Sequence, residues 1–155
     1  MELPQQVCSL ELAKRLQELG VKQASLFWWR QQVQEHLERN GTVTFVPTES
    51  WVVNDRPGSA DSYSAFTVAE LGEILPESIH VSGDPFHLRI THGTRAVNHW
   101  AIGYTNYDAS WWPGLIDEKN EANGRAKLLV YLLENNLLTV ESASQGVPQS
   151  GTDER

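Results

Sequence analysis

Four of the five histidines lie close together in the chain and are the first candidates for chemistry. They are His80, His87, His92 and His99. Imidazoles that a hairpin brings together can bind zinc, but the spacing matches no usual ligand pattern and no cysteine is near, so no metal is expected. In the register suggested by the alternation of residues 86–104, Arg89 shares a face with His87, and His99 points to the other face. The residues His87, Arg89 and His99 therefore form an alternative site for a small enzyme or a ligand-binding protein.

Other catalytic signatures are absent. The sequence contains no Gly-x-Ser-x-Gly nucleophile elbow and no glycine-rich phosphate loop of either standard spacing. Cys8, the only cysteine, precedes a predicted helix, which can lower a thiol pKa, but a small buried hydrophobe is the more common role. The carboxylates show no pattern that selects an acid and a base. We therefore expect no catalytic residue and no cofactor.

Tryptophan is the one unusual feature of the composition. Six occur, with doublets at Trp28-Trp29 and Trp111-Trp112. Neighbours on a strand face opposite sides, so one member of the first doublet can be exposed, and the second doublet lies in a predicted loop. Exposed aromatic residues are frequent anchors of interfaces, although a small domain also uses them to fill its core. We predict an aromatic patch near Trp28, Trp111 and Trp112 that binds a protein partner or a second copy.

Length and charge limit the function further. A chain of 155 residues is the size of one domain and can bury a core without disulfides. Its formal charge of −8, with no long basic cluster, argues against a nucleic-acid partner, because that affinity comes mostly from neutralised phosphates. No secretory signal is visible, and the apolar runs are too short for a membrane span. We expect a cytoplasmic protein with no membrane partner.

Three amphipathic helices must position these residues. The first is predicted over residues 9–19, with Ser9 as its N-cap. The second begins with a capping box of Thr67 and Glu70 and ends at Pro76. The third covers about residues 118–134 and has so wide an apolar stripe that it must be buried against a sheet. Gly124 within it would permit a close approach to a strand.

The strands are predicted from shorter signals. Residues 42–46 and 51–53 are predicted as two strands separated by a turn, and residues 54–62 as a loop. Residues 79–81 form a short strand, and residues 86–104 a β-hairpin. Residues 25–39 fit either a helix or an aromatic-rich strand, because short apolar runs cannot be assigned by periodicity alone.

Three stretches together resemble a known group of proteins. They are Val7–Gln23 leading into Ser25–Trp29, Tyr63–Pro76, and Glu121–Leu138. In this order they are similar to a family of small uncharacterised proteins of bacterial genomes, often in phage or prophage contexts. The resemblance covers the three helices and implies a strand at Leu26–Trp29. It implies no activity, cofactor or catalytic residue.

The sequence as a whole predicts an α+β fold, with three helices packed on a mainly antiparallel sheet of four to six strands. Residues 1–140 form a single domain, and residues 141–155, rich in serine, glutamine and glycine, form a disordered tail. The leading hypothesis is a non-enzymatic protein-interaction domain of phage or prophage origin. The small enzyme or ligand-binding protein is the alternative, and nucleic-acid binding is the third possibility.

Overall fold

A computed structural model describes residues 2–58, 61–93 and 97–145 and confirms the α+β class. The helices are η1 (Leu3–Gln5), α1 (Leu10–Glu18), α2 (Val68–Ile74), α3 (Glu121–Glu134) and α4 (Val140–Gln145). The strands are β1 (Trp28–Leu37), β2 (Val43–Asn54), β3 (Ser62–Ser64), β4 (Ser78–Val81), β5 (Asp84–His92), β6 (Trp100–Thr105) and β7 (Trp111–Glu118). None of the helices in these ranges is both long and apolar enough to cross a membrane.

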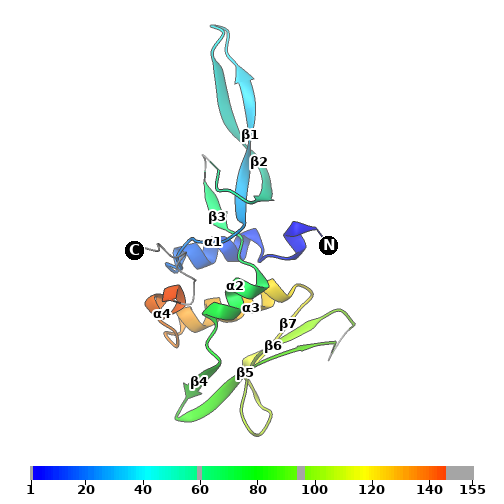
Figure 1. The fold of residues 1–155 in the computed structure, drawn as a ribbon, viewed down its shortest axis with the longest axis vertical. Coiled ribbons are helices and arrows are strands. Elements are labelled where there is room, and N and C mark those ends of the chain that lie inside the picture. The colour runs from blue at the N-terminus through cyan, green and yellow to red at the C-terminus, as the bar shows by residue number, and fades with distance from the viewer. Residues whose placement is uncertain (1, 59–60, 94–96, 146–155) are drawn as a thin grey trace, which may run out of the picture.

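The strands make two antiparallel sheets rather than the single sheet that was predicted. One has the order β2-β1-β3 and the other the order β4-β5-β6-β7. In Figure 1 the helices lie between the two sheets, and the β1–β2 hairpin projects far beyond them. Residues 25–39, which the sequence left open, therefore contribute a strand, β1.

Local signals fix the helix starts, at Ser9 and Thr67 as predicted and for α3 three residues later than the predicted residue 118. The hydroxyl of Ser9 accepts a hydrogen bond from the backbone N–H of Leu12. Thr67 and Glu70 form both halves of the capping box that begins α2. α3 begins after Asn120, whose side-chain oxygen accepts from the N–H of Asn123. Each cap satisfies a backbone donor that the helix itself leaves unpaired.

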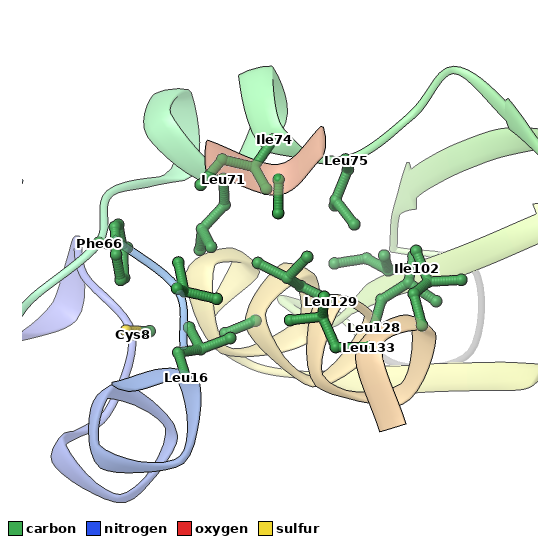
Figure 2. Close-up of a cluster of buried hydrophobic side chains, with 14 of the residues drawn as sticks. Cys8, Leu16, Phe66, Leu71, Ile74, Leu75, Ile102, Leu128, Leu129 and Leu133 are labelled. Atoms are coloured by element: carbon green, nitrogen blue, oxygen red, sulfur yellow. The ribbon is translucent and has the colours of Figure 1, made fainter. Parts of the chain in front are cut away.

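The core is built around α3, as its wide apolar stripe predicts. Leu128, Leu129 and Leu132 on this helix are fully buried. Figure 2 shows Leu128 and Leu129 between Leu16 and Leu71 from the other helices and Ile102 from β6. Because α3 contacts helices on one side and the four-stranded sheet on the other, loss of its packing would affect both halves of the fold.

Gly124 lies where α3 packs closely against Ile102 of β6. A Cβ atom at this position would meet Cδ1 of the buried Ile102 at 2.5 Å. Gly124→Ala gains about 1 kcal/mol of helix propensity but overpacks the core, which costs about 1–3 kcal/mol. We expect a net loss of stability in urea unfolding. The loss should shrink in an Ile102→Val background, which removes the clashing methyl group, and an equal loss in both backgrounds would contradict the assigned contact.

The predicted tail begins with ordered structure. Residues 140–145 form α4, whose first turn is capped by the Thr139 hydroxyl. Ala143 is fully buried, and Val140 lies against Gly20. The composition of this segment is polar, but two small apolar residues are enough to attach one helical turn to the core. Residues 146–155 of the predicted tail lie outside the described residues.

Three other segments differ from the sequence predictions. The two strands predicted at 42–46 and 51–53 are one long strand, β2, with a register shift near its middle. Residues 62–64, at the end of a predicted loop, pair with β1 as β3. The predicted loop around Trp111 and Trp112 is the strand β7, which contains Pro113. β7 is an edge strand, where a proline removes no ladder hydrogen bond.

Candidate functional site

The most exposed element of the fold is the distal half of the β1–β2 hairpin, which we call the arm. It comprises Val33–Leu37 of β1, the turn at residues 38–42, and Val43–Pro47 of β2. Five residue pairs at about 3.4 Å each make it roughly 17 Å long. In Figure 1 it extends away from both the helices and the other sheet.

One face of the arm is apolar. Directly opposed residues of an antiparallel pair project from the same face, and the register pairs Leu37 with Val43, Glu35 with Phe45, and Val33 with Pro47. Leu37 is 70% exposed and Phe45 is 63% exposed. The opposite face is mostly polar and carries Gln34, His36, Thr44 and Val46. The arm thus has the alternation of a half-buried strand, but nothing in the described chain covers its apolar side.

Two aromatic contacts hold the root of the arm to the body. The indole N–H of Trp29 donates a hydrogen bond of 2.8 Å to the backbone oxygen of Cys8. Trp51 of β2 packs on Tyr63 of β3, with ring centroids 5.7 Å apart. The ammonium group of Lys14 on α1 lies 5.0 Å from the Trp51 ring and 5.5 Å from the Tyr63 ring, a favourable cation–π geometry.

A single carboxylate fixes the chain where it leads into β1. Glu70 accepts hydrogen bonds from the backbone N–H of Leu26 at 2.8 Å and from the hydroxyl of Ser25 at 3.0 Å. The same carboxylate closes the capping box with the N–H of Thr67 at 2.7 Å. One side chain therefore connects the start of α2 to the segment before the arm, so the direction of the arm is tied to the helical layer.

The structure does not bring the predicted tryptophans into one patch. Trp28 lies at the start of β1 in the three-stranded sheet, whereas Trp111 and Trp112 lie at the start of β7 in the other sheet. All three are partly buried. Trp112 packs on Phe86 and Tyr131, so it belongs to the core. The exposed apolar surface is instead on the arm, which the tryptophan count could not indicate.

Trp111 lies on the outer face of the four-stranded sheet. A Cβ atom at Gly103 would meet its ring at 3.0 Å, so the absence of a side chain there makes room for the indole. The guanidinium carbon of Arg89 is 5.7 Å from the centre of the Trp111 ring. The Trp111 ring covers Gly103 on this face, and Arg89 beside the ring remains exposed to solvent.

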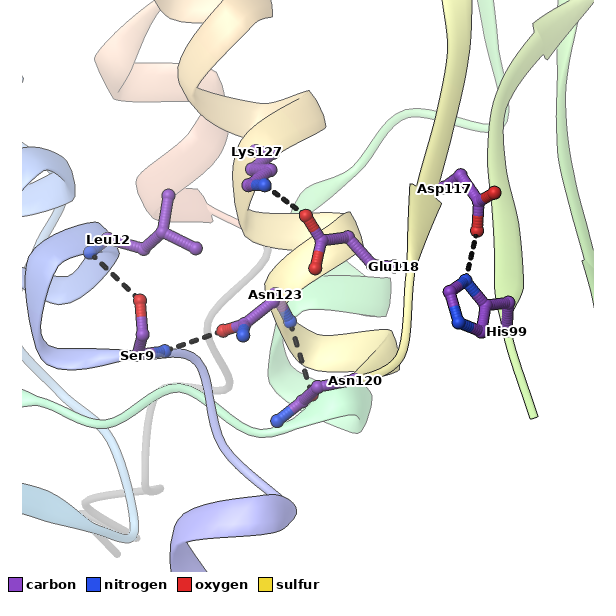
Figure 3. A network of polar contacts seen from close by, with 8 residues as sticks. All are labelled: Ser9, Leu12, His99, Asp117, Glu118, Asn120, Asn123 and Lys127. Atoms are coloured by element: carbon purple, nitrogen blue, oxygen red, sulfur yellow. Dashed lines mark hydrogen bonds and ion pairs between the residues drawn. The ribbon is translucent and has the colours of Figure 1, made fainter. Parts of the chain in front are cut away.

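The histidine prediction is corrected in its geometry. A 2.7 Å hydrogen bond joins Nδ1 of His99 and Oδ1 of Asp117 (Figure 3). Asp117 pairs with Ala101 on the face that also carries His87 and Arg89. His99 is therefore on the same face as the other two: Trp100 is paired with His92 and faces the core side, so its neighbour His99 projects from the opposite face, together with Ala101. Along the strands, however, six residues separate His99 from the row of His87, or roughly 20 Å.

The predicted site is thus divided into two parts, His99 on one side and His87 with Arg89 on the other, and neither part has a reactive arrangement in the described structure. His99 uses its ring for Asp117, and its backbone oxygen accepts from the N–H of Gly93. Within the described ranges, no group of three His, Cys, Asp or Glu side chains could hold a metal ion. Burial raises the pKa of the Cys8 thiol to about 12, so this thiol is not a nucleophile near neutral pH.

A pocket of about 320 Å³ lies near the starts of α2 and α3. Its lining includes Gln5, Trp100, Lys119 and Glu121. The carboxylate of Glu121 is already bonded to Arg125 at 2.6 Å. Nearby, the side-chain amide of Asn120 donates to the backbone oxygen of Val7. Asn123 accepts from the backbone N–H of Ser9 (Figure 3), and the two bonds tie the N-terminal segment to α3. The polar groups of this region therefore serve the fold.

The arm is the candidate functional site that remains. A comparison of the chain with known protein families, with curated proteins and with solved structures finds no match to any of them.

Proposed function

We propose that the protein is a non-enzymatic interaction domain that binds a partner protein through the arm. The observation that carries the proposal is the apolar face of the arm, with Leu37 70% and Phe45 63% exposed. Exposed apolar residues that adjoin one another mark interaction surfaces, whereas isolated ones need no explanation. The remaining exposed large hydrophobics of the described chain do not form such a pair of facing strands: Leu3 is on η1, Leu26 precedes β1, and Val97 and Tyr107 lie in the connections before and after β6.

The stability of the fold does not account for the arm. Its side chains are outside the core cluster, and a two-stranded hairpin without further cover is at best marginally stable in water. The body would keep its core if the hairpin ended near Gln31 and Trp51. The chain nevertheless continues with alternating apolar residues for five further pairs, and we attribute this alternation to a surface supplied by another protein. A cytoplasmic location, which suits the free thiol of Cys8, is part of the same proposal.

Quantitative co-purification from the native cell tests this function. The wild-type chain is compared with a Leu37→Ser, Phe45→Ser double variant and with a Tyr107→Ser control, because Tyr107 is 91% exposed away from the arm. All three should unfold within about 0.5 kcal/mol of one another, as exposed positions usually do. We expect the double variant alone to lose a specific partner. If the same proteins are recovered at the same levels with all three chains, the arm is not the binding element.

A further inference from the structure

The two edges of the arm differ in their ability to accept another strand. β2 is the outer strand of its sheet, and Pro47 on it has no N–H to offer to a neighbour. β1 lies between β2 and β3, but β3 covers it only from Trp28 to Arg30. From Val33 to Leu37 no described strand pairs with this second edge of β1. A further strand placed beside Val33–Leu37 would lie on the same side of β1 as β3, and it would extend the existing sheet.

The register shows which backbone groups of this edge point outward. The N–H of Glu38 donates to the oxygen of Thr42, so that opposed pair is hydrogen-bonded. Hydrogen-bonded and non-hydrogen-bonded pairs alternate along antiparallel strands. The pair of Val33 and Pro47 is then non-hydrogen-bonded, which agrees with the missing N–H of the proline. It follows that the N–H and C=O groups of Val33, Glu35 and Leu37 point away from β2.

The other end of β1 gives the same answer independently. The N–H of Ala65 donates to the oxygen of Phe27 on the β3 side. By alternation, the odd-numbered residues of β1 direct their backbone groups toward that side. The open edge therefore carries three N–H and three C=O groups in one row, and no described strand pairs with this row.

The charge on this edge selects among possible occupants. Glu35 stands in the middle of the apolar face, and among the described residues it makes no ion pair. Like charges directly opposed across two strands are destabilising and opposite charges are stabilising. A second copy that paired symmetrically about Glu35 would oppose two carboxylates, and the whole chain has a net charge of −8, which disfavours self-association. A basic residue would satisfy Glu35.

We propose that the open edge of β1 accepts an extended segment of a partner protein by β-strand addition. The segment carries apolar residues at alternate positions, which continue the apolar face of the arm, and a lysine or arginine opposite Glu35. Main-chain hydrogen bonds supply affinity in this mode of recognition, and alternate side chains supply specificity. The inference rests on the proposed function and specifies the chemistry of the partner.

A designed peptide tests the edge directly on the full chain. The probe is a capped peptide of alternating valine and threonine with a central lysine. Amide hydrogen exchange, read residue by residue by NMR, should slow at Val33, Glu35 and Leu37 when the peptide is added. A peptide with glutamate at the centre should bind roughly fivefold more weakly at low salt, by the difference between opposed and like charge pairs. The same lysine peptide with alternate backbone nitrogens methylated should give no protection. Protection at none of the three amides would overturn the inference.

Two variants of the protein separate backbone recognition from side-chain recognition. Val33→Pro removes an outward N–H and leaves the β1–β2 ladder intact, as Pro47 already does on the other strand, and it should abolish peptide binding. Glu35→Lys should reverse the preference, so that the glutamate peptide binds better than the lysine peptide. Peptide binding that is unchanged in Val33→Pro, or an unchanged preference in Glu35→Lys, would contradict strand addition at this edge.

The co-purified partner distinguishes failure of this inference from failure of the proposed function. If Val33→Pro loses the partner that the Leu37→Ser, Phe45→Ser variant also loses, both proposals are supported. If only the serine variant loses it, the partner binds the apolar face without adding a strand; the inference fails and the proposed function stands. If neither variant loses it, both fail.

Discussion

Leu129→Ala should lower the free energy of unfolding by about 2–5 kcal/mol, the cost of removing a large aliphatic side chain from a packed core. Leu129 is fully buried on α3, and in Figure 2 it lies among side chains from several elements. Because these neighbours belong to both the helical layer and the sheet, they cannot all move inward to fill the cavity, so part of the cavity persists. Urea unfolding monitored by tryptophan fluorescence measures the loss.

Lys127→Ala on the same helix is the matched control for Leu129→Ala. Lys127 is exposed and pairs with Glu118, and an exposed ion pair contributes at most about 1 kcal/mol. Its removal should therefore change stability much less than the loss of Leu129. A loss below 1 kcal/mol for Leu129→Ala, or losses of equal size for the two variants, would contradict the central position of α3.

Glu70→Ala should lower the free energy of unfolding by about 2–3 kcal/mol. One part is the capping box with Thr67, worth about 1 kcal/mol. The rest comes from the backbone N–H of Leu26 and the hydroxyl of Ser25, which lose a charged acceptor. Thermal or urea unfolding measures the total. Glu73→Ala, an exposed change in the same helix, should alter stability by less than about 0.5 kcal/mol.

Glu70→Ala should also act on the arm, since the carboxylate holds the segment that leads into β1. The amides of Leu26 and Phe27 should exchange faster with solvent in the variant. The amides of α3 should exchange faster only by the amount that the loss of global stability explains. If the loss of stability is confined to α2 and exchange at Leu26 does not change, the connection between helix and arm is not as described.

The helices were predictable because their signals are local. Ser9 and the pair of Thr67 and Glu70 identify helix starts within one turn of sequence, and the width of the apolar stripe on α3 is a property of that helix alone. Gly124 could also be interpreted correctly, because a glycine inside so strong a helix pattern is costly unless something approaches closely.

The sheets were less predictable because their geometry depends on distant partners. Residues 48–50 have the composition of a turn, but in the structure they form the irregular middle of β2, with the Thr48 hydroxyl bonded to the oxygen of Gln32 on the facing strand. Pro113 and Gly114 suggest a loop, and only the place of β7 at a sheet edge makes the proline compatible with a strand. The face of His99 depended on the position of the hairpin turn, which alternation does not determine.

The sequence did not predict the position of the candidate site, and its role as an interaction surface stays a prediction. The sequence suggested a protein-interaction domain without catalytic residues, but it directed attention to three tryptophans that are partly buried and divided between the two sheets. Val33, Leu37, Val43 and Phe45 alternate with polar residues as in any half-buried strand. Such a pattern predicts that one face is covered. It cannot show that no described part of the chain covers this face, which becomes visible only when β1 and β2 are seen to extend past the body (Figure 1).

Photo-crosslinking in the native cell tests the central claim most directly. A photoreactive phenylalanine analogue replaces Phe45 on the apolar face, Thr44 on the opposite face of the same strand, or Tyr107 on the body. The account predicts that the chain labelled at position 45 crosslinks to one dominant partner protein and that the other two do not. Equal crosslinking from all three positions, or none from position 45, would contradict it.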